Sequence, residues 1–179
     1  QNLSTSLSSD DQNSSKIPVR SHAELMRQGW KYRLSGGKFG DVDIVEVAGK
    51  NYAVKTIKHG ITGSYLEEAS ESLKREINFY QARDGKFLPH VLFCVGINED
   101  DNHKYKSITL PLYGNNFATF LESNKNLSED KIRYYFAQII SALLEMQTLG
   151  YAHFDIKPEN ILMKPDESLA IADLRLSQI

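Results

Sequence analysis

Three oxygen-bearing side chains stand close together near the C-terminal end of the sequence: Asp155, Asn160 and Asp173. The first two lie in a polar stretch, 151–163, that is wedged between apolar segments. Carboxylate and amide oxygens are ligands that Mg²⁺ prefers, and Mg²⁺ bridges phosphate oxygens. The pattern therefore predicts magnesium-dependent phosphoryl transfer. Asp155 would orient and deprotonate an attacking hydroxyl, and Lys157 would steady the transferred group.

A glycine-rich segment over residues 35–42, SGGKFGDV, lies between two predicted strands. Glycines let backbone N–H groups approach an anion closely and permit positive φ angles. Two interpretations stay open for this segment taken alone: a phosphate cradle and a flexible hairpin loop. A dinucleotide-binding loop of the Rossmann type is disfavoured, because a strand and not a helix follows.

A lysine and a glutamate form a candidate ion pair upstream of the polar stretch. Ala53 and Lys55 point to the same face of a predicted strand, so a flat ring has room there and the ammonium can reach phosphates. Glu76 lies within the apolar stripe of a helix predicted over 66–83. A buried carboxylate needs a partner, and Lys55 is the candidate. In the alternative, the helix is rotated and Glu76 is solvated.

Hydrophobic periodicity and turn residues give the elements that must position these groups. The predicted elements are strands between 30 and 58, a helix over 66–83, a hairpin of 91–97 with 105–110 around a polar turn at 98–102, helices over 116–123 and 129–149, and a hairpin over 161–172. This order of strands, helix, strands, helices and hairpin indicates an α+β fold in two lobes.

The longest predicted helix, 129–149, has recognisable ends. Ser128 is its expected N-cap and Gly150 its expected stop. Its expected core stripe consists of Ile132, Phe136, Ile139, Leu143 and Met146.

Composition limits the classes of protein that remain. The chain has 179 residues, is 41% hydrophobic and 25% charged, and carries a net charge of −2. These values are typical of a soluble globular protein and give no sign of a nucleic acid or an anionic membrane as partner. The single cysteine, Cys94, excludes an intramolecular disulfide framework and a multi-cysteine zinc site. It fits a reducing compartment, so we expect an intracellular protein, cytoplasmic or nuclear.

The N-terminal residues differ in composition from the rest. Residues 1–16 are rich in serine and poor in apolar side chains, so we expect a disordered tail. The remaining chain divides into an expected small lobe over 17–110 and an expected linker and second lobe over 111–179.

The motifs, in their order, resemble those of a eukaryotic protein kinase. They are the glycine-rich loop, Ala-Val-Lys at 53–55, the helix glutamate, HxDxKPEN at 153–160 and a DFG-like triplet at 173–175. Lys157, two residues after Asp155, resembles serine/threonine rather than tyrosine kinases. The segments 111–121 and 152–163 faintly resemble the LAMMER and SR-protein kinase branch.

The resemblance implies a protein kinase-like two-lobed fold. The small lobe would be an antiparallel sheet with one helix, and the chain would include the hinge and the first part of a helical large lobe. The implied activity is transfer of the ATP γ-phosphate to Ser/Thr hydroxyls of protein substrates, with Mg²⁺. We expect the rest of the large lobe to come from further chain or from a second polypeptide.

The resemblance also assigns roles residue by residue. The implied catalytic residues are Asp155 as base, Lys157, Lys55 and Glu76, and the implied Mg²⁺ ligands are Asn160 and Asp173. The implied ATP contacts are Ser35, Gly37, Gly40, Val42, Ala53, Lys55, Leu110 as gatekeeper, Pro111 and Tyr113 in the hinge, and Leu162. Pro111 lacks an N–H but keeps the carbonyl that adenine would bind.

Four positions depart from the family pattern. Ser35 replaces the first glycine of the loop, Leu174 a phenylalanine and Arg175 a glycine. Phe154 replaces the arginine that commonly pairs with a phosphorylated activation loop, so we expect activity that does not depend on such a phosphate. Two alternatives to the enzyme remain: a nucleotide-binding pseudokinase or scaffold, and a small-molecule phosphotransferase of related fold.

Overall fold

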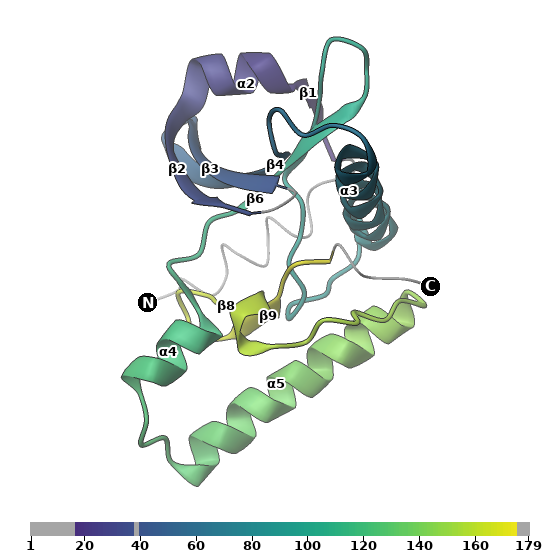
Figure 1. The fold of residues 1–179 in the computed structure, drawn as a ribbon. Coiled ribbons are helices and arrows are strands. Elements are labelled where there is room, and N and C mark those ends of the chain that lie inside the picture. The colour runs from purple at the N-terminus through teal and green to yellow at the C-terminus, as the bar shows by residue number, and fades with distance from the viewer. Residues whose placement is uncertain (1–16, 38–39, 175–179) are drawn as a thin grey trace. The chain divides into compact units, whose positions relative to one another are not determined.

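The computed structural model describes residues 17–37 and 40–174 (Figure 1). The tail predicted for 1–16 and the departure at Arg175 lie outside the described residues. Two compact units make up the described chain: 17–81 with 93–112, and 82–92 with 113–174. No helix among the described residues is long and apolar enough to cross a membrane.

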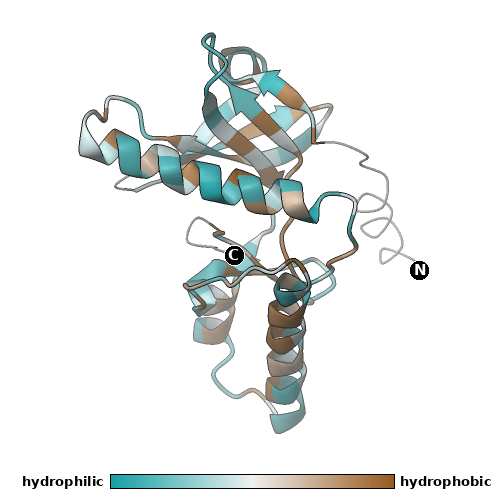
Figure 2. Ribbon diagram, turned by 90° about the vertical axis from the view of Figure 1, so that its right-hand side faces the viewer, coloured by the Kyte–Doolittle hydropathy of each residue, from teal (hydrophilic) through white to brown (hydrophobic). Residues whose placement is uncertain are grey.

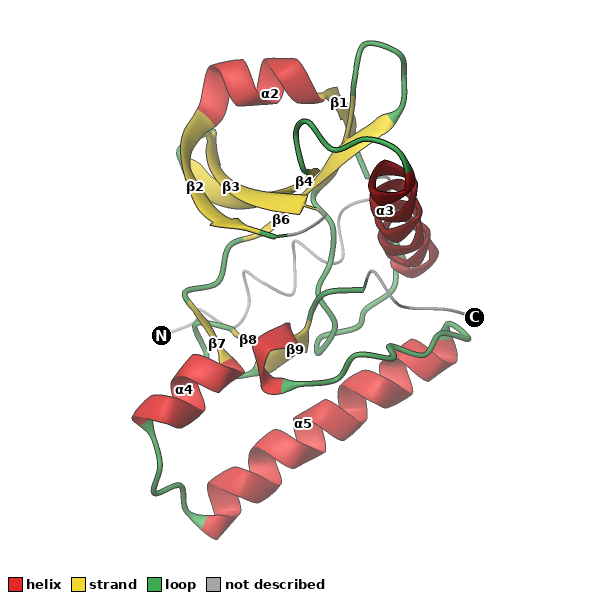
Figure 3. Cartoon of the chain, viewed as in Figure 1, coloured by secondary structure: helices red, strands yellow, loops and turns green. Residues whose placement is uncertain are grey.

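The first unit is built on a six-stranded sheet in the order β1-β5-β6-β4-β3-β2 (Figure 3). Its strands are β1 (Val19–Ser21), β2 (Trp30–Gly36), β3 (Gly40–Val47), β4 (Lys50–Ile57), β5 (Gly96–Glu99) and β6 (Tyr105–Pro111). All neighbours pair antiparallel except β1 and β5, which are parallel. Two helices begin in this part of the chain, α2 (His22–Gly29) and α3 (Ser64–Arg83).

The short helix α2 packs on the sheet through one apolar residue and one histidine. Leu25 forms a buried cluster with Val45 of β3 and Val54 of β4. Burying such side chains is worth about 1.5–3 kcal/mol each. His22 lies 2.7 Å, Nδ1 to Oγ, from Ser107 of β6. The strand β1 and the helix α2 were not predicted from the sequence, because neither is long enough to show a clear period.

The second unit combines a three-stranded sheet with two helices. Its elements are β7 (Asn115–Asn116), α4 (Phe117–Ser123), α5 (Glu129–Thr148), the 3₁₀ turn η1 (Pro158–Asn160), β8 (Ile161–Met163) and β9 (Leu169–Ile171). The strand order is β7-β8-β9. The helix α5 begins after the predicted cap, since the Ser128 hydroxyl accepts the N–H of Lys131 at 3.2 Å. Gly150 follows its end with a φ of 77°.

Most of the predicted core stripe of α5 is exposed in the described part of the chain. Ile132, Leu143 and Phe136 are exposed, Phe136 by 63%, while Met146 is buried as expected. The buried face instead carries Tyr135, Gln138, Ala142 and Met146. Much of this helix is hydrophobic, as the brown colour in Figure 2 shows. Apolar residues of α5 occur among both the buried and the exposed side chains, so hydropathy alone does not select the buried face.

Two specific contacts decide which face of α5 is buried. The ring of Tyr135 packs edge-on against Phe117 of α4, with centroids 5.2 Å apart. The side-chain oxygen of Gln138 accepts the N–H of Leu169 in β9 at 2.6 Å. A buried glutamine that completes a sheet hydrogen bond is not visible in a hydrophobic pattern.

The predicted hairpin of 91–97 with 105–110 is also shorter than expected. Only Gly96–Glu99 pairs with β6, so Asn98 lies in a strand and not in the turn. Asn98 is fully buried, and its side-chain nitrogen donates to the hydroxyls of Ser107 at 2.9 Å and Thr109 at 3.1 Å. These bonds stabilise a polar residue in a strand interior.

Candidate active site

The glycine-rich segment forms the end of the β2–β3 hairpin. The N–H of Gly37 donates to the carbonyl of Gly40 at 2.7 Å. A Cβ on Gly40 would lie 2.7 Å from the carbonyl oxygen of Thr56, which is too close for any side chain. Ser35 stands opposite Val42 in the register, and residues 38 and 39 lie outside the described part. A tight hairpin with approachable backbone is what a phosphate cradle requires.

One face of the sheet carries several of the predicted nucleotide contacts. Val42 stands opposite Lys55, and Ala53 stands opposite both Ile44 and Leu110. Residues opposite each other in an antiparallel pair project from the same face, and so do residues two apart along a strand. Val42, Ala53, Lys55 and Leu110 therefore share one face. Ala53 is the small residue on it, and leaves the room that a flat ring would need.

The structure brings Lys55 of β4 and Glu76 of α3 together. The Lys55 ammonium donates to Oε1 of Glu76 in a short ion pair. The Glu76 side chain is only 1% exposed, whereas Lys55 is partly exposed. Because a buried carboxylate is costly without a cation, this pair fixes where the lysine ammonium lies.

The remaining predicted nucleotide contacts lie at the end of one unit and in the other. Pro111 ends β6 opposite Tyr52, and Tyr113 belongs to the second unit. Leu162 is in the middle strand β8, opposite Asn116 and Ala170, and is partly buried.

Asp155 stands at the centre of the polar groups in the second unit. The side-chain nitrogen of Asn160 donates to the Asp155 carbonyl at 2.9 Å and to its Oδ2 at 3.1 Å. The Lys157 ammonium lies 3.8 Å from the same Oδ2. The Asp155 carboxylate is partly exposed, so it is oriented by its neighbours and still accessible to a substrate hydroxyl.

A buried histidine joins this loop to the segment that carries Asp173. His153 Nδ1 accepts the N–H of Asp155 at 3.1 Å, and Nε2 lies 2.7 Å from the carbonyl oxygen of Ala172. A carbonyl can only accept, so Nε2 carries the proton. The N–H of Ala172 in turn donates to the Asn160 carbonyl at 2.8 Å. Both backbone groups of Ala172, next to Asp173, are thereby held by the loop of Asp155.

The donor set suits a hard cation that also binds phosphate. Because Asn160 commits its side-chain nitrogen to Asp155, its Oδ1 is the atom left for a cation, and Asp173 offers a carboxylate. No group of three His, Cys, Asp or Glu side chains that could hold a metal occurs in the described part of the chain. Two protein oxygens with the remaining positions filled by phosphate and water is a common arrangement for Mg²⁺.

Two non-glycine residues beside these groups adopt left-handed backbone. Phe154 has a φ of 67° and Asp173 a φ of 57°. This conformation costs about 1 kcal/mol or more for such residues and is concentrated at functional sites. Neither this strain nor the role of His153, which bonds to both Asp155 and Ala172, was predicted from the sequence. The position of His153, two residues before Asp155, could have indicated that role.

Comparison with known proteins agrees with the geometry. The family model described as protein kinase domain matches residues 31–179, so this chain belongs to the protein kinase domain family. The serine/threonine-protein kinase cds1 of Schizosaccharomyces pombe is 31% identical over 176 residues. The maternal embryonic leucine zipper kinase of Danio rerio is 30% identical over 163 residues, and CBK1 of Pneumocystis carinii is 29% identical over 146. The predicted kinase resemblance and α+β kinase fold are confirmed.

The matches cover most of this chain but a minor part of each relative. They include 96%, 89% and 80% of the chain, and 36%, 23% and 28% of the respective relatives. The faint resemblance to the LAMMER and SR-protein kinase branch stays a prediction.

Proposed function

We propose that the protein transfers the γ-phosphate of ATP to Ser/Thr hydroxyls of protein substrates. The observation that carries the proposal is the Asp155 carboxylate, held by Asn160 and Lys157 and left accessible. A catalytic base needs this combination of fixed geometry and access. The names of the relatives, which are serine/threonine-protein kinases in two of the three cases, support the acceptor class.

In the proposed reaction the chain's residues position groups and move one proton. The oxygen of the substrate hydroxyl bonds to the γ-phosphorus, and Asp155 accepts the proton of that hydroxyl. The bond from that phosphorus to the β–γ bridging oxygen breaks, and ADP leaves. Lys55, held by Glu76, would contact the α- and β-phosphates, and Lys157 would stabilise the transferred phosphoryl group. Asn160 and Asp173 would hold Mg²⁺, which neutralises phosphate charge when bound.

The other nucleotide contacts are proposed from the same face of the sheet and from the family pattern. Ser35, Gly37 and Gly40 would cover the phosphates. The adenine would contact apolar side chains and the hinge. The adenine contacts are Val42, Ala53, Leu110, Pro111, Tyr113 and Leu162.

The deciding experiment measures phosphate transfer by the full-length protein. Labelled ATP is offered with a panel of Ser/Thr peptides, including an Arg-Ser-rich one, with and without Mg²⁺. Asp155→Asn is the matched control, since it keeps shape and removes the base. Transfer that needs both Mg²⁺ and Asp155 supports the proposal, and transfer that survives Asp155→Asn overturns it.

A nucleotide-binding pseudokinase or scaffold is the second candidate, favoured by one observation. Phe154, next to the proposed base, replaces a cation and is strongly exposed. Full-length protein that binds ATP but transfers to no peptide would support this candidate. We also propose an intracellular location, cytoplasmic or nuclear, supported by a single buried cysteine thiol, Cys94.

A further inference from the structure

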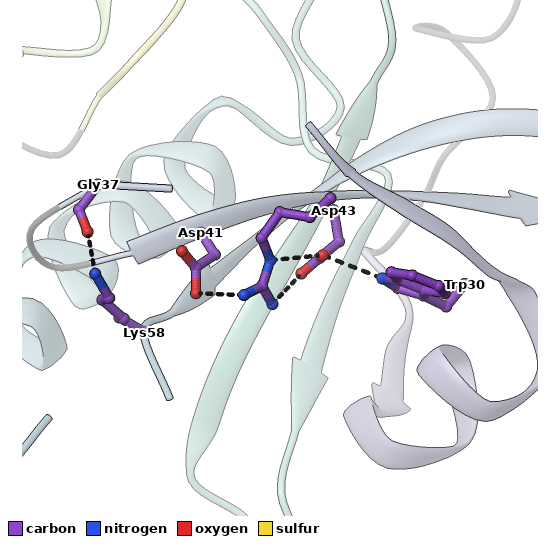
Figure 4. A network of polar contacts seen from close by, with 6 residues as sticks. Trp30, Gly37, Asp41, Asp43 and Lys58 are labelled. Atoms are coloured by element: carbon purple, nitrogen blue, oxygen red, sulfur yellow. Dashed lines mark hydrogen bonds and ion pairs between the residues drawn. The ribbon is translucent and has the colours of Figure 1, made fainter. Parts of the chain in front are cut away.

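A cluster of charged residues crosses the base of the β2–β3 hairpin, on the opposite sheet face from Lys55. Asp41 and Asp43, on β3, are 5% and 3% exposed. The Arg33 guanidinium, on β2, lies 3.2 Å from Oδ2 of Asp41 and donates to both oxygens of Asp43 at 3.1 and 3.3 Å. The indole N–H of Trp30 donates to the same Asp43 at 3.1 Å. Figure 4 shows Asp41 and Asp43 side by side with Trp30 beyond them.

The register of β2 explains how these side chains meet. Arg33 stands opposite Asp43, and irregularities in the pairing lie between Trp30 and Tyr32 and between Arg33 and Ser35. Residues three apart on a regular strand project from opposite faces. The first bulge brings Trp30 and Arg33 to the same face, where they meet the two carboxylates.

The cluster also lies against Gly36, a glycine of the hairpin that is not among the predicted phosphate contacts. A Cβ on Gly36 would lie 2.9 Å from Oδ1 of Asp41. The buried Asp41 carboxylate therefore fills the space of a side chain at position 36. Arg33 links the two strands directly at this point, because it comes from β2 and Asp41 from β3.

A second cation reaches the hairpin from the neighbouring strand. The ammonium of Lys58, one residue past β4, donates to the carbonyl of Gly37 at 3.1 Å (Figure 4). The N–H of Gly37 donates to the carbonyl of Gly40. The N–H of Gly37 therefore has its partner at the start of β3, and the carbonyl has its partner just after β4.

We propose that Lys58 and the Arg33–Asp41–Asp43 cluster are positioning residues that hold the two arms of the glycine-rich hairpin and thereby set the affinity for nucleotide phosphates. The inference rests on the proposed function. Neither cation touches a reacting atom. They act through the backbone of Gly36, Gly37 and Gly40, the part of the hairpin that would cover the phosphates. Holding such groups in place before the ligand arrives lowers the ordering cost of binding.

The test uses Lys58→Met in the full-length protein, because Lys58 is exposed and its loss leaves no buried charge. We expect the KM for ATP to rise about threefold to tenfold with little change in kcat, as for a lost ground-state binding interaction. Amide hydrogen exchange in residues 36–41 should be at least about threefold faster. Lys58→Arg should restore both values. The matched control is Lys50→Met, an exposed lysine at the other end of β4.

Arg33 is tested by Arg33→Lys, since removing the charge would leave two buried carboxylates and risk unfolding. Lysine keeps the charge but loses the two-pronged contact, so exchange in 36–41 and the KM for ATP should both rise. Wild-type exchange and wild-type KM in Lys58→Met and Arg33→Lys would overturn the proposal. The exchange readout does not require nucleotide, so absence of ATP binding by the wild type would refute the proposed function by a separate result.

Discussion

The buried carboxylate of Glu76 on α3 accepts a hydrogen bond from the ammonium of Lys55 on β4, twenty-one residues earlier in the chain. The strand alternation places Lys55 on the face of Val42 and Ala53, and the helix period places Glu76 on the buried side of α3. Lys55 therefore stabilises the buried carboxylate of Glu76, in addition to any role that its ammonium has in the chemistry.

Removing one partner of this pair should damage both stability and activity. In Lys55→Met the buried Glu76 loses its cation, and we expect a loss of about 3 kcal/mol in the free energy of unfolding. Phosphate transfer should fall by about 100-fold or more. Denaturant unfolding and steady-state kinetics measure the two effects.

The double variant Lys55→Met/Glu76→Leu separates the two roles. An apolar pair of similar volume should recover most of the lost stability, since it removes the buried carboxylate together with its cation. Activity should stay at the level of the single variant. Recovered activity would contradict the proposed role of Lys55 at the phosphates.

His153 should act on the rate of transfer rather than on nucleotide binding. In His153→Leu the N–H of Asp155 and the carbonyl of Ala172 both lose their partner, which we expect to cost about 2–3 kcal/mol. Because the segments of Asp155 and Asp173 then keep only the bond from the Ala172 N–H to the Asn160 carbonyl, kcat should fall while the KM for ATP changes little. His59→Leu, an exposed histidine in the other unit, is the control. A rise in KM with unchanged kcat would refute this role.

Some of the fold and site was predictable because local signals and tertiary contacts agree. The start of α5 follows from Ser128, and the placement of Glu76 follows from the apolar period of α3. The buried face of α5 was not predictable, since Gln138 is selected by a backbone group of β9 and not by hydrophobicity. The cluster around Asp43 depends on a β-bulge, which shifts residues between faces without a sequence period to mark it.

Glu145 on α5 should make stability fall as pH rises. Burial raises the pKa of its carboxyl above the ordinary 4.5, against the opposing effects of the His90 N–H and the nearby positive charges. Between the ordinary and the raised value the native state keeps a proton that the unfolded chain has lost. Native stability therefore decreases as pH rises through that window.

Comparison with Glu145→Gln isolates this contribution. Glutamine can still accept the N–H of His90, which now donates to Glu145 at 3.0 Å, but it does not titrate. We expect the unfolding free energy of the wild type, minus that of the variant, to fall as the pH rises from the ordinary pKa of 4.5 through the raised one. Urea unfolding across that range measures it. A difference that is flat or rises with pH would show that the carboxyl is not destabilised by burial.

Phe154 should free the enzyme from activation by phosphorylation. The residue precedes Asp155, is 67% exposed and carries no charge, so a phosphate on a later segment finds no cation at this position. Phosphatase treatment of the full-length protein should leave peptide phosphorylation unchanged within about twofold. Phe154→Arg supplies a guanidinium that can pair with phosphate, and phosphatase should lower the activity of this variant. Transfer by the wild type that is lost on dephosphorylation would show that another cation performs this task.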